Sequence, residues 1–282
     1  MEYVEKRIDL EQHPKGEVTI LPIGDVQSGV PASDLTRLRR HMNWGTSNRA
    51  LFLGMGDYVD MASPSNRRSL KAATLYDSVT SALEAKAQED VGGFLEAVGG
   101  SEHMWLGLLQ GHHFMELEDG NTSDTMIAQA LGAPFLGDSA MVRLIFNDTS
   151  DCDGNPVSAT IWCHHGRGGG NKAGSPLNTI EQVARGFNAD IYLMGHQHKK
   201  VAAPTDELFF SSRGQLLHHT KLLACTGSFL KGYLENSMLG GRASGTYVEK
   251  GMMAPVSLGG IVIRLRVIQE SYGDRLDMSV EL

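Results

Sequence analysis

Short apolar runs, each followed by polar residues, recur along the first two-thirds of the chain. The run Glu17–Ile23 predicts a buried strand that ends at Gly24-Asp25, and Ala50–Met55 predicts a second strand that ends at Gly56-Asp57. Three later runs end in paired histidines. They are Met104–Leu109 before His112-His113, Ser158–Cys163 before His164-His165, and Ile191–Met194 before His196-Gln197-His198.

Helical patterns separate these strands, which predicts an α/β fold. Ser33 is expected to cap the first helix, and Ala62–Ser69 is expected to be a loop because it is rich in Ser, Pro, Asn and Arg. The expected helices are 33–42, 72–97 with a break at Gly92-Gly93, 122–131 and 176–187, and the further strands are 141–146, 201–202, 208–210, 221–225 and 261–267. No linker or repeat divides the chain, so residues 1–282 are interpreted as one domain with its motifs in 18–200 and additional strands in 201–282.

Composition adds histidine to this picture. Eleven histidines are present, and eight of them fall in the close pairs His112/His113, His164/His165, His196/His198 and His218/His219. Since neutral imidazole is the commonest metal ligand in proteins, this usage favours metal or acid–base chemistry. Only the pair His218/His219 follows the last strand-end motif, and a surface or packing role is favoured for it over substrate contact.

Charge and apolar content exclude several classes of protein. The 282 residues carry 33 acidic against 25 basic side chains, a formal net charge of −8, which argues against a large nonspecific nucleic-acid surface. No apolar stretch approaches the ~18 residues of a membrane span, and Met1–Gln12 is too charged for a secretory signal. The three separated cysteines, Cys152, Cys163 and Cys225, form no disulfide framework. A cytoplasmic protein without a membrane partner is therefore expected.

The polar residues at the five strand ends are predicted to meet, because ligands of open α/β sheets bind beyond the carboxyl ends of the strands. Two carboxylates and several imidazoles suit Mn, Fe, Zn or Co better than Ca or Mg alone. The set exceeds what one tetrahedral ion uses, whereas two ions that share a bridging carboxylate would occupy it. Metal pairs ~3.5–4 Å apart recur in phosphoester hydrolysis.

At these residues the sequence resembles the calcineurin-like metallophosphoesterase superfamily. The family signature is Asp-x-His, Gly-Asp-x-x-Asp, Gly-Asn-His, a His after a strand, and Gly-His-x-His. The matching positions are Asp25-Val26-Gln27, Gly56-Asp57-Tyr58-Val59-Asp60, Gly111-His112-His113, His164-His165 and Gly195-His196-Gln197-His198. The resemblance covers residues 18–200, and it implies a four-layer α-β-β-α sandwich of two mixed sheets with a dimetal site at the strand ends.

The resemblance also implies a role for each motif residue. Asp25 and His198 would bind the first metal, and Asp57 would bridge both. His196 and either His164 or His165 would bind the second. In the same way, His113 would protonate the leaving oxygen of the substrate, and Asp60 would orient His113.

Two positions depart from the family pattern. Gln27 replaces the first-motif histidine, as in the Asp-x-Gln motif of manganese-dependent ADP-ribose/CDP-alcohol pyrophosphatases, which favours Mn and makes nucleotide diphosphates candidate substrates. His112 replaces the usual asparagine and can itself bind a metal. Two divalent ions are therefore expected, with Mn favoured and Fe, Zn, Ni or Co as alternatives.

Basic residues near the motifs are candidates for binding a phosphate. Arg67 and Arg68 follow the second motif, near where phosphatases of this fold place a phosphate-binding arginine, and a bidentate guanidinium on phosphate is the hypothesis. The loop 166–174, with Arg167 and Lys172, is either a phosphate-wrapping or a flexible surface loop.

The predicted function is hydrolysis of a phosphomonoester or phosphodiester, of nucleotides or nucleic acid, by in-line attack of metal-bound hydroxide. A nuclease of the same superfamily is the closest rival, because Thr226–Gly259 resembles the C-terminal part of phage-encoded members, which would act in the host cytoplasm. A local basic track could then offset the acidic total: Arg37, Arg39, Arg40, Arg67 and Arg68. A metal-depleted interaction scaffold is the non-enzymatic alternative, and a protein phosphatase is disfavoured because Met61, rather than Arg-Gly, follows Asp60.

Overall fold

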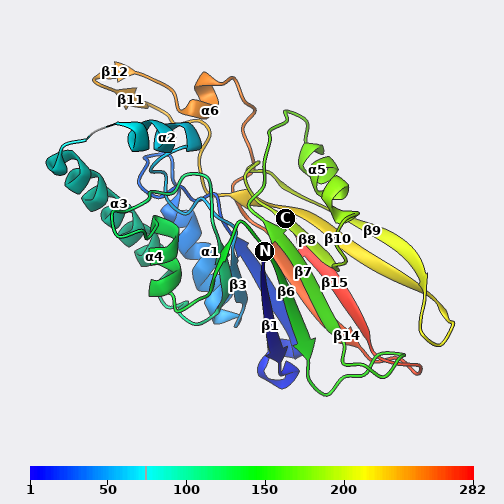
Figure 1. The fold of residues 1–282 in the computed structure, drawn as a ribbon. Coiled ribbons are helices and arrows are strands. Elements are labelled where there is room, and N and C mark those ends of the chain that lie inside the picture. Colours follow the sequence, from blue (N-terminus) through cyan, green and yellow to red (C-terminus); the bar gives the residue numbers. More distant parts are fainter. Residues whose placement is uncertain (74) are drawn as a thin grey trace.

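A computed structural model describes residues 1–73 and 75–282, and two mixed β-sheets form its centre (Figure 1). The strands of the first sheet, in spatial order, are β1 (Glu2–Ile8), β6 (Ser139–Phe146), β7 (Ser158–His164), β8 (Ile191–Met194), β10 (Leu216–Ser228) and β13 (Gly259–Gly260), with β9 (Lys200–Phe210) also paired with β10. Three of its strand pairs are parallel, namely β1–β6, β7–β8 and β8–β10. The pairs β6–β7, β9–β10 and β10–β13 are antiparallel.

The second sheet has a parallel half and an antiparallel half. Strands β2 to β5 run parallel, and β14 and β15 complete the sheet in antiparallel pairing. Its spatial order is β15 (Arg275–Glu281), β14 (Val262–Ile268), β2 (Glu17–Ile23), β3 (Leu51–Gly54), β4 (Trp105–Leu109) and β5 (Phe135–Gly137). The C-terminal part of the chain thus joins both sheets, since β13 pairs with β10 and β14 pairs with β2.

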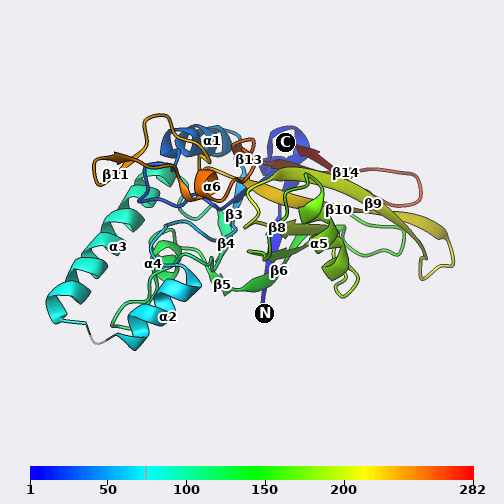
Figure 2. The same cartoon turned by 90° about the horizontal axis from the view of Figure 1, so that it is seen from above.

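Helices cover the outer face of each sheet (Figure 2). The helices α1, α3 and α4 pack with residues of β2, β3 and β4, and α5 packs with residues of β7, β8 and β10. The fold is therefore the predicted α-β-β-α sandwich of two mixed sheets. The helices are α1 (Leu35–Ser47), α2 (Pro64–Ala72), α3 (Asp77–Val98), α4 (Ser123–Ala130), α5 (Ser175–Ala184) and α6 (Tyr247–Lys250), and two single-turn 3₁₀ helices (Leu10–Gln12 and Pro14–Gly16) connect β1 to β2.

Strand β2 shows why the central strands are apolar on both faces. Val18 and Ile20 point into the core between the two sheets, whereas Leu21 and Ile23 point into the core beneath α1 and α3. All four side chains are fully buried. A strand covered on both faces loses the alternation of apolar and polar residues and becomes a continuous apolar run. Such runs were the clearest signal in the sequence, and β2 and β8 begin and end at the predicted residues.

The region 62–98 differs from its prediction. Residues 64–69, expected in a loop, belong to helix α2, which runs from Pro64 to Ala72. Ser63 caps this helix by accepting a hydrogen bond from Asn66 N, and a proline occupies its first turn. Helix α3 starts at Asp77 rather than at residue 72. It continues through Gly92-Gly93, where a break was expected. Position 74 of the predicted helix lies outside the described residues.

Tertiary packing explains why the glycine pair in α3 does not break the helix. Ser28 Oγ donates a hydrogen bond to Asp90 O at 2.9 Å. A Cβ at Gly93 would lie 3.2 Å from Ser28 Oγ. The helix therefore approaches the loop after β2 closely, and this packing overrides the weak helix propensity of glycine.

Other differences concern a helix start and two edge strands. Asp34, not Ser33, caps α1 by accepting a hydrogen bond from Arg37 N. Strands β1 and β15 were not predicted, because both are edge strands that carry charged residues along an exposed face. Within the part of the chain that the structure describes, no helix combines the length and apolar composition that crossing a membrane requires.

The unexplained histidine pair lies on the β9–β10 hairpin, which extends away from α1 to α4 in both views (Figures 1 and 2). His219 Nε2 lies 2.6 Å from Asp190 Oδ1, and its Nδ1 lies 3.3 Å from Glu207 Oε1. Asp190 in turn accepts a hydrogen bond from Thr160 N. Through Asp190, His219 therefore connects the hairpin to the start of β7, while His218 is exposed. The surface or packing role favoured from the sequence agrees with this arrangement.

This network predicts a pH-dependent contribution of His219 to stability. The pKa of His219 is raised, chiefly by its hydrogen bond to the Asp190 carboxylate. Its stabilising effect is thus complete below the unfolded-state pKa of about 6.5 and disappears as the pH rises through the higher folded-state pKa. We expect His219→Gln to lower the free energy of unfolding by about 1 kcal/mol at pH 6 and by less at pH 9. Urea denaturation at both pH values measures the difference.

The adjacent variant His218→Gln is the control, because His218 is exposed. It should leave the free energy of unfolding unchanged at both pH values. An equal effect of the two substitutions, or a larger effect of His219→Gln at pH 9, would contradict this assignment.

Candidate metal centre

The five strand ends singled out in the sequence meet where the two sheets face each other. Within the second sheet, Asp25 N donates to Gly56 O at 3.0 Å. Two bonds cross to the other sheet: His196 N donates to Asp25 Oδ2 at 2.8 Å, and His165 Nδ1 donates to Met55 O at 2.7 Å. Residues from the ends of β2, β3, β7 and β8 are therefore hydrogen-bonded to one another, as the convergence of strand ends predicts.

The backbone after β2, β3 and β8 contains residues in the left-handed conformation. Five of the eight predicted metal ligands have positive φ, namely Asp25 (49°), Gln27 (51°), Asp57 (53°), His196 (64°) and His198 (56°). Residues other than glycine seldom adopt this conformation, and strained backbone of this kind concentrates at functional sites. The chain therefore turns sharply after β2, β3 and β8, which directs the polar side chains toward the shared edge.

Close backbone contact between the loops requires glycine at two of the turns. A Cβ at Gly111 would collide with the backbone nitrogen and the carboxylate of Asp57. Gly56 has φ +89°, and a Cβ there would lie 2.7 Å from both Gly111 Cα and His165 Nδ1. These glycines therefore allow the ends of β3, β4 and β7 to approach within hydrogen-bonding distance.

Asp57 is the centre of this arrangement, with only 2% of its surface exposed. Its Oδ1 accepts hydrogen bonds from the backbone nitrogens of His112 and His113, the latter at 3.0 Å, and its Oδ2 lies 3.3 Å from His165 Nε2. Burial alone would raise the pKa of Asp57, but the facing His165 and these backbone donors hold it well below its usual value. The carboxylate is therefore ionised.

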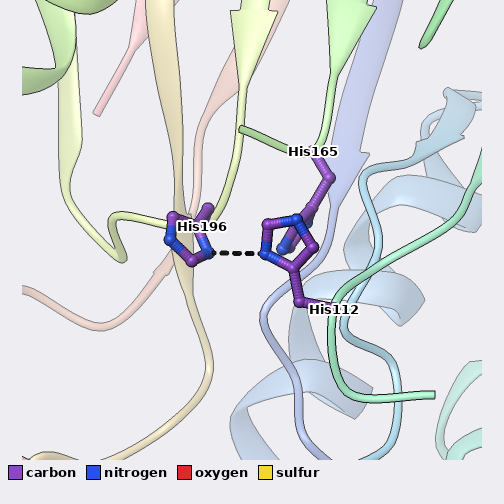
Figure 3. A group of neighbouring side chains, drawn as sticks. All are labelled: His112, His165 and His196. Atoms are coloured by element: carbon purple, nitrogen blue, oxygen red, sulfur yellow. Dashed lines mark hydrogen bonds between the residues drawn. The ribbon is translucent and has the colours of Figure 1, made fainter. Parts of the chain in front are cut away.

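Three imidazoles from three strand ends face one another (Figure 3), and the ring of His165 contacts Asp57. The Nδ1 atoms of His112 and His196 are 3.3 Å apart, and one ring nitrogen from each of His112, His165 and His196 lies within 4.8 Å of the others. Burial, followed by repulsion from the neighbouring imidazoles, lowers the pKa of His112 to about 4 and also lowers that of His196. Both rings are thus neutral near pH 7, the form that binds metals.

His165 has the orientation of a metal ligand. Because a carbonyl can only accept, the bond to Met55 O places a proton on Nδ1 and leaves Nε2 facing Asp57. Metal-binding histidines usually donate their second nitrogen to a carbonyl or carboxylate in this way. Burial would lower the pKa of His165, but Asp57 and Asp25 raise it to about 9, so a cation bound at Nε2 would displace the proton that otherwise balances the buried carboxylates.

A second candidate ligand group shares His165 with the first and adds Asp25 and Asp57. His198 Nε2 lies 3.3 Å from Asp25 Oδ1. Among the described residues, Asp25 Oδ1, Gln27 Oε1 and His165 Nε2 are buried side-chain atoms without a hydrogen bond. Unsatisfied buried polar atoms are rare, and cations bound by these oxygens and nitrogens would satisfy them. The donor set therefore fits divalent metal ions.

The structure distinguishes the two histidines that the sequence left as alternatives. His165 is 1% exposed and belongs to both ligand groups. His164 Nδ1 instead accepts a hydrogen bond from Gly166 N, and its ring stacks on Trp162 at 6.0 Å between centroids. The geometry thus favours His165 as the ligand.

His113 and Asp60 form a pair at the edge of the cluster. His113 Nδ1 lies 2.6 Å from Asp60 Oδ1, and its Nε2 is 4.0 Å from Asp57 Oδ2. Burial would lower the pKa of His113, but the hydrogen bond to Asp60 raises it overall. A histidine held this way favours the imidazolium form that a general acid requires.

Of the two arginines proposed to bind phosphate, Arg67 is held by hydrogen bonds to backbone carbonyls. Its Nη1 donates to Ala62 O and His112 O, both at 2.5 Å, and its guanidinium lies 3.7 Å from the centre of the Phe114 ring. Arg67 thereby fastens α2 to the loop that carries His112 and His113. Arg68 is exposed.

The other three arginines of the predicted basic track, Arg37, Arg39 and Arg40, have different neighbours. Arg39 pairs with Glu96 at 3.0 Å. Arg37 and Arg40 instead line a cavity of about 340 Å³ together with Lys200, two residues after His198. The cavity therefore combines basic residues distant in the sequence with the acidic Asp34, which pairs with Arg37 at 3.6 Å.

Sequence reasoning missed Asp124, which is 1% exposed and accepts a hydrogen bond from Gly111 N at 2.9 Å. Burial raises its pKa to about 7. Asp124 fixes the turn that presents His112 and His113. Because it lies in the first turn of α4, where acidic residues are common, the sequence contains no signal of this contact.

Comparison with known proteins finds only distant structural similarity. No protein-family profile matches the chain, and no curated protein matches its sequence. Similar solved structures include a single-mutant Vps29 from Entamoeba histolytica (11% identity, 94% of this chain and 100% of that one, TM-score 0.39) and wild-type Vps29 of that organism complexed with Zn²⁺ (9%, 93% and 99%, 0.38). Another is a "predicted phosphoesterase" from Streptococcus pneumoniae (13%, 93% and 88%, 0.30). Similarity at this level does not transfer an activity to this chain.

The two neighbouring histidines provide a direct test of the metal centre. His165→Ala removes a nitrogen shared by both ligand groups, so we expect the metal content to fall by at least half. His164→Ala should leave it unchanged, because His164 faces Trp162 and Gly166. Elemental analysis of protein dialysed against Mn²⁺ measures both, with circular dichroism to confirm folding. Metal loss in folded His164→Ala, or full retention in His165→Ala, would reverse the assignment.

Proposed function

We propose that the chain is a two-metal phosphoesterase that hydrolyses phosphomonoester or phosphodiester bonds. One observation carries the proposal: two candidate ligand groups share His165 and lie next to the hydrogen-bonded pair His113–Asp60. Such a site combines cation ligands with a proton donor, the two elements of metal-assisted phosphoester hydrolysis. Mn²⁺ is the favoured ion, because the donors are a mixture of carboxylate, amide and imidazole.

The chain's own residues would divide the work between holding charge and moving a proton. Two divalent cations at this site would supply a hydroxide at neutral pH and neutralise the oxygens of the phosphate. Asp57 and Asp25 would hold these cations, with His165, His196 and His198 as nitrogen ligands and Gln27 and His112 completing the set. His113 Nε2 would donate a proton to the leaving oxygen, and Asp60 would orient the ring through Nδ1.

The substrate that we propose is a nucleotide or nucleic-acid phosphoester. Bound cations would place positive charge at the phosphate position although the whole chain carries a formal charge of −8. A nuclease is the second candidate, favoured by the basic cavity of Arg37, Arg40 and Lys200 near the same edge of the first sheet. This cavity could hold additional phosphates of a longer substrate, whereas a single nucleotide would not need it.

Asp57→Asn tests the bridging role of this carboxylate. The substitution removes the negative charge that faces His165 and accepts from two backbone nitrogens, so we expect loss of both metals and of all activity. Elemental analysis and turnover of bis-p-nitrophenyl phosphate with Mn²⁺ measure the two effects. Retention of both metals in folded protein would contradict the assignment. A wild-type protein without metal or turnover would instead favour an interaction scaffold.

His113→Ala tests proton donation separately from metal binding. We expect the rate to fall by about 10²- to 10⁴-fold, the usual contribution of a general acid, while the metal content remains that of the wild type. Steady-state kinetics at saturating Mn²⁺ provide the rate. An unchanged rate would remove His113 from the mechanism, and a parallel loss of metal would make it a ligand instead.

A further inference from the structure

A cavity of about 490 Å³ lies directly beside the candidate metal centre. Gln27 and Asp60 form part of its wall, so the cavity and the metal centre share residues. The other walls come from residues 30–32 in the loop after β2 and from the segment 230–250, which carries β11 (Met238–Leu239), β12 (Arg242–Ala243) and α6. Its volume lies in the ~300–1,000 Å³ range of small-molecule sites.

Hydrogen bonds hold the segment 230–250 in place. At its start, Lys231 N donates to Ala32 O at 2.8 Å. Further along, Thr246 Oγ1 donates to Gly232 O, which ties the start of α6 back to the cavity wall. Hydrogen bonds therefore fix the segment 230–250 against the loop after β2, and these two parts of the chain form the cavity walls.

The lining suits a flat, largely apolar group. Val30, Pro31 and Leu234 supply apolar surface, and Tyr247 supplies an aromatic ring that is 48% exposed. Tyr247 lines the same cavity as Gln27 and Asp60 of the metal centre, and burial, followed by the carboxylates there, raises its pKa. A ligand against Tyr247 would therefore lie next to a phosphate held there.

We propose that this cavity binds the base of a nucleotide phosphoester, with the Tyr247 ring as a stacking surface. The proposal rests on the proposed function, because a phosphate at the metal centre is what places the base in the cavity. Every base has a π-face, so an aromatic ring binds bases with little preference among them. Of the charged residues that line the cavity, Lys231 is paired with Asp34 at 3.4 Å and Asp60 with His113 at 2.6 Å. The substrate class is thus nucleotide esters rather than sugar phosphates.

Two ligands that differ only in the base test this inference without any turnover. They are the phosphonate analogues of adenosine 5′-monophosphate and ribose 5-phosphate, in which a methylene group replaces the ester oxygen and prevents hydrolysis. We expect calorimetric titration to show about tenfold tighter binding of the adenosine analogue. Tyr247→Ala should reduce the difference to less than twofold, whereas Tyr247→Phe should keep it.

Tyr76→Ala is the matched control, because Tyr76 is 82% exposed and does not line the cavity, and it should preserve the tenfold preference. Equal binding of the two analogues to the wild type, or a preference that survives in folded Tyr247→Ala, would overturn the inference. The test is separate from that of the proposed function. A base preference without phosphoester turnover would support the cavity assignment and contradict the proposed catalysis. Turnover without a base preference would support catalysis and contradict the cavity assignment.

Discussion

Burial of two carboxylates between the sheets is the constraint on which the rest of the structure depends. Asp25 and Asp57 are 0% and 2% exposed, and a buried charge is tolerated only when it is paired and hydrogen-bonded. Backbone nitrogens of His112, His113 and His196, together with the imidazole of His165, supply that compensation. Because these donors come from both sheets, satisfying the carboxylates also fixes how the sheets meet. The proposed chemistry and the closure of the fold therefore use the same contacts.

Sequence reasoning succeeded where one local pattern determined the structure. Continuous apolar runs identified the buried strands, and the polar residues after them identified the candidate site, because parallel strands end at a common edge. It did not locate β1 and β15, whose charged edges lack that pattern, or α2, where a serine cap and a proline looked like loop signals. The continuity of α3 through Gly92-Gly93 depends on packing against Ser28, a contact between residues distant in the chain.

The choice between His164 and His165 shows the same limit at the site. Consecutive residues at a strand end point in opposite directions, and only the paired strands decide which one faces the metal centre. The structure turns His165 toward Asp57 and His164 toward Trp162. Asp124 and Tyr247 were similarly beyond reach of the sequence, since each approaches the site from an element that carries none of the motifs. The segment 230–250, distant from every motif, supplies one wall of the cavity beside them.

The central claim is that two cations share the carboxylates and imidazoles around Asp57 and His165. Electron paramagnetic resonance of the protein titrated with Mn²⁺ tests this most directly, because two ions bridged by one carboxylate interact magnetically and separated ions do not. The account predicts that a spin-coupled Mn²⁺ pair develops as the second ion binds. A spectrum of isolated Mn²⁺ at every loading, or no binding at all, would contradict it.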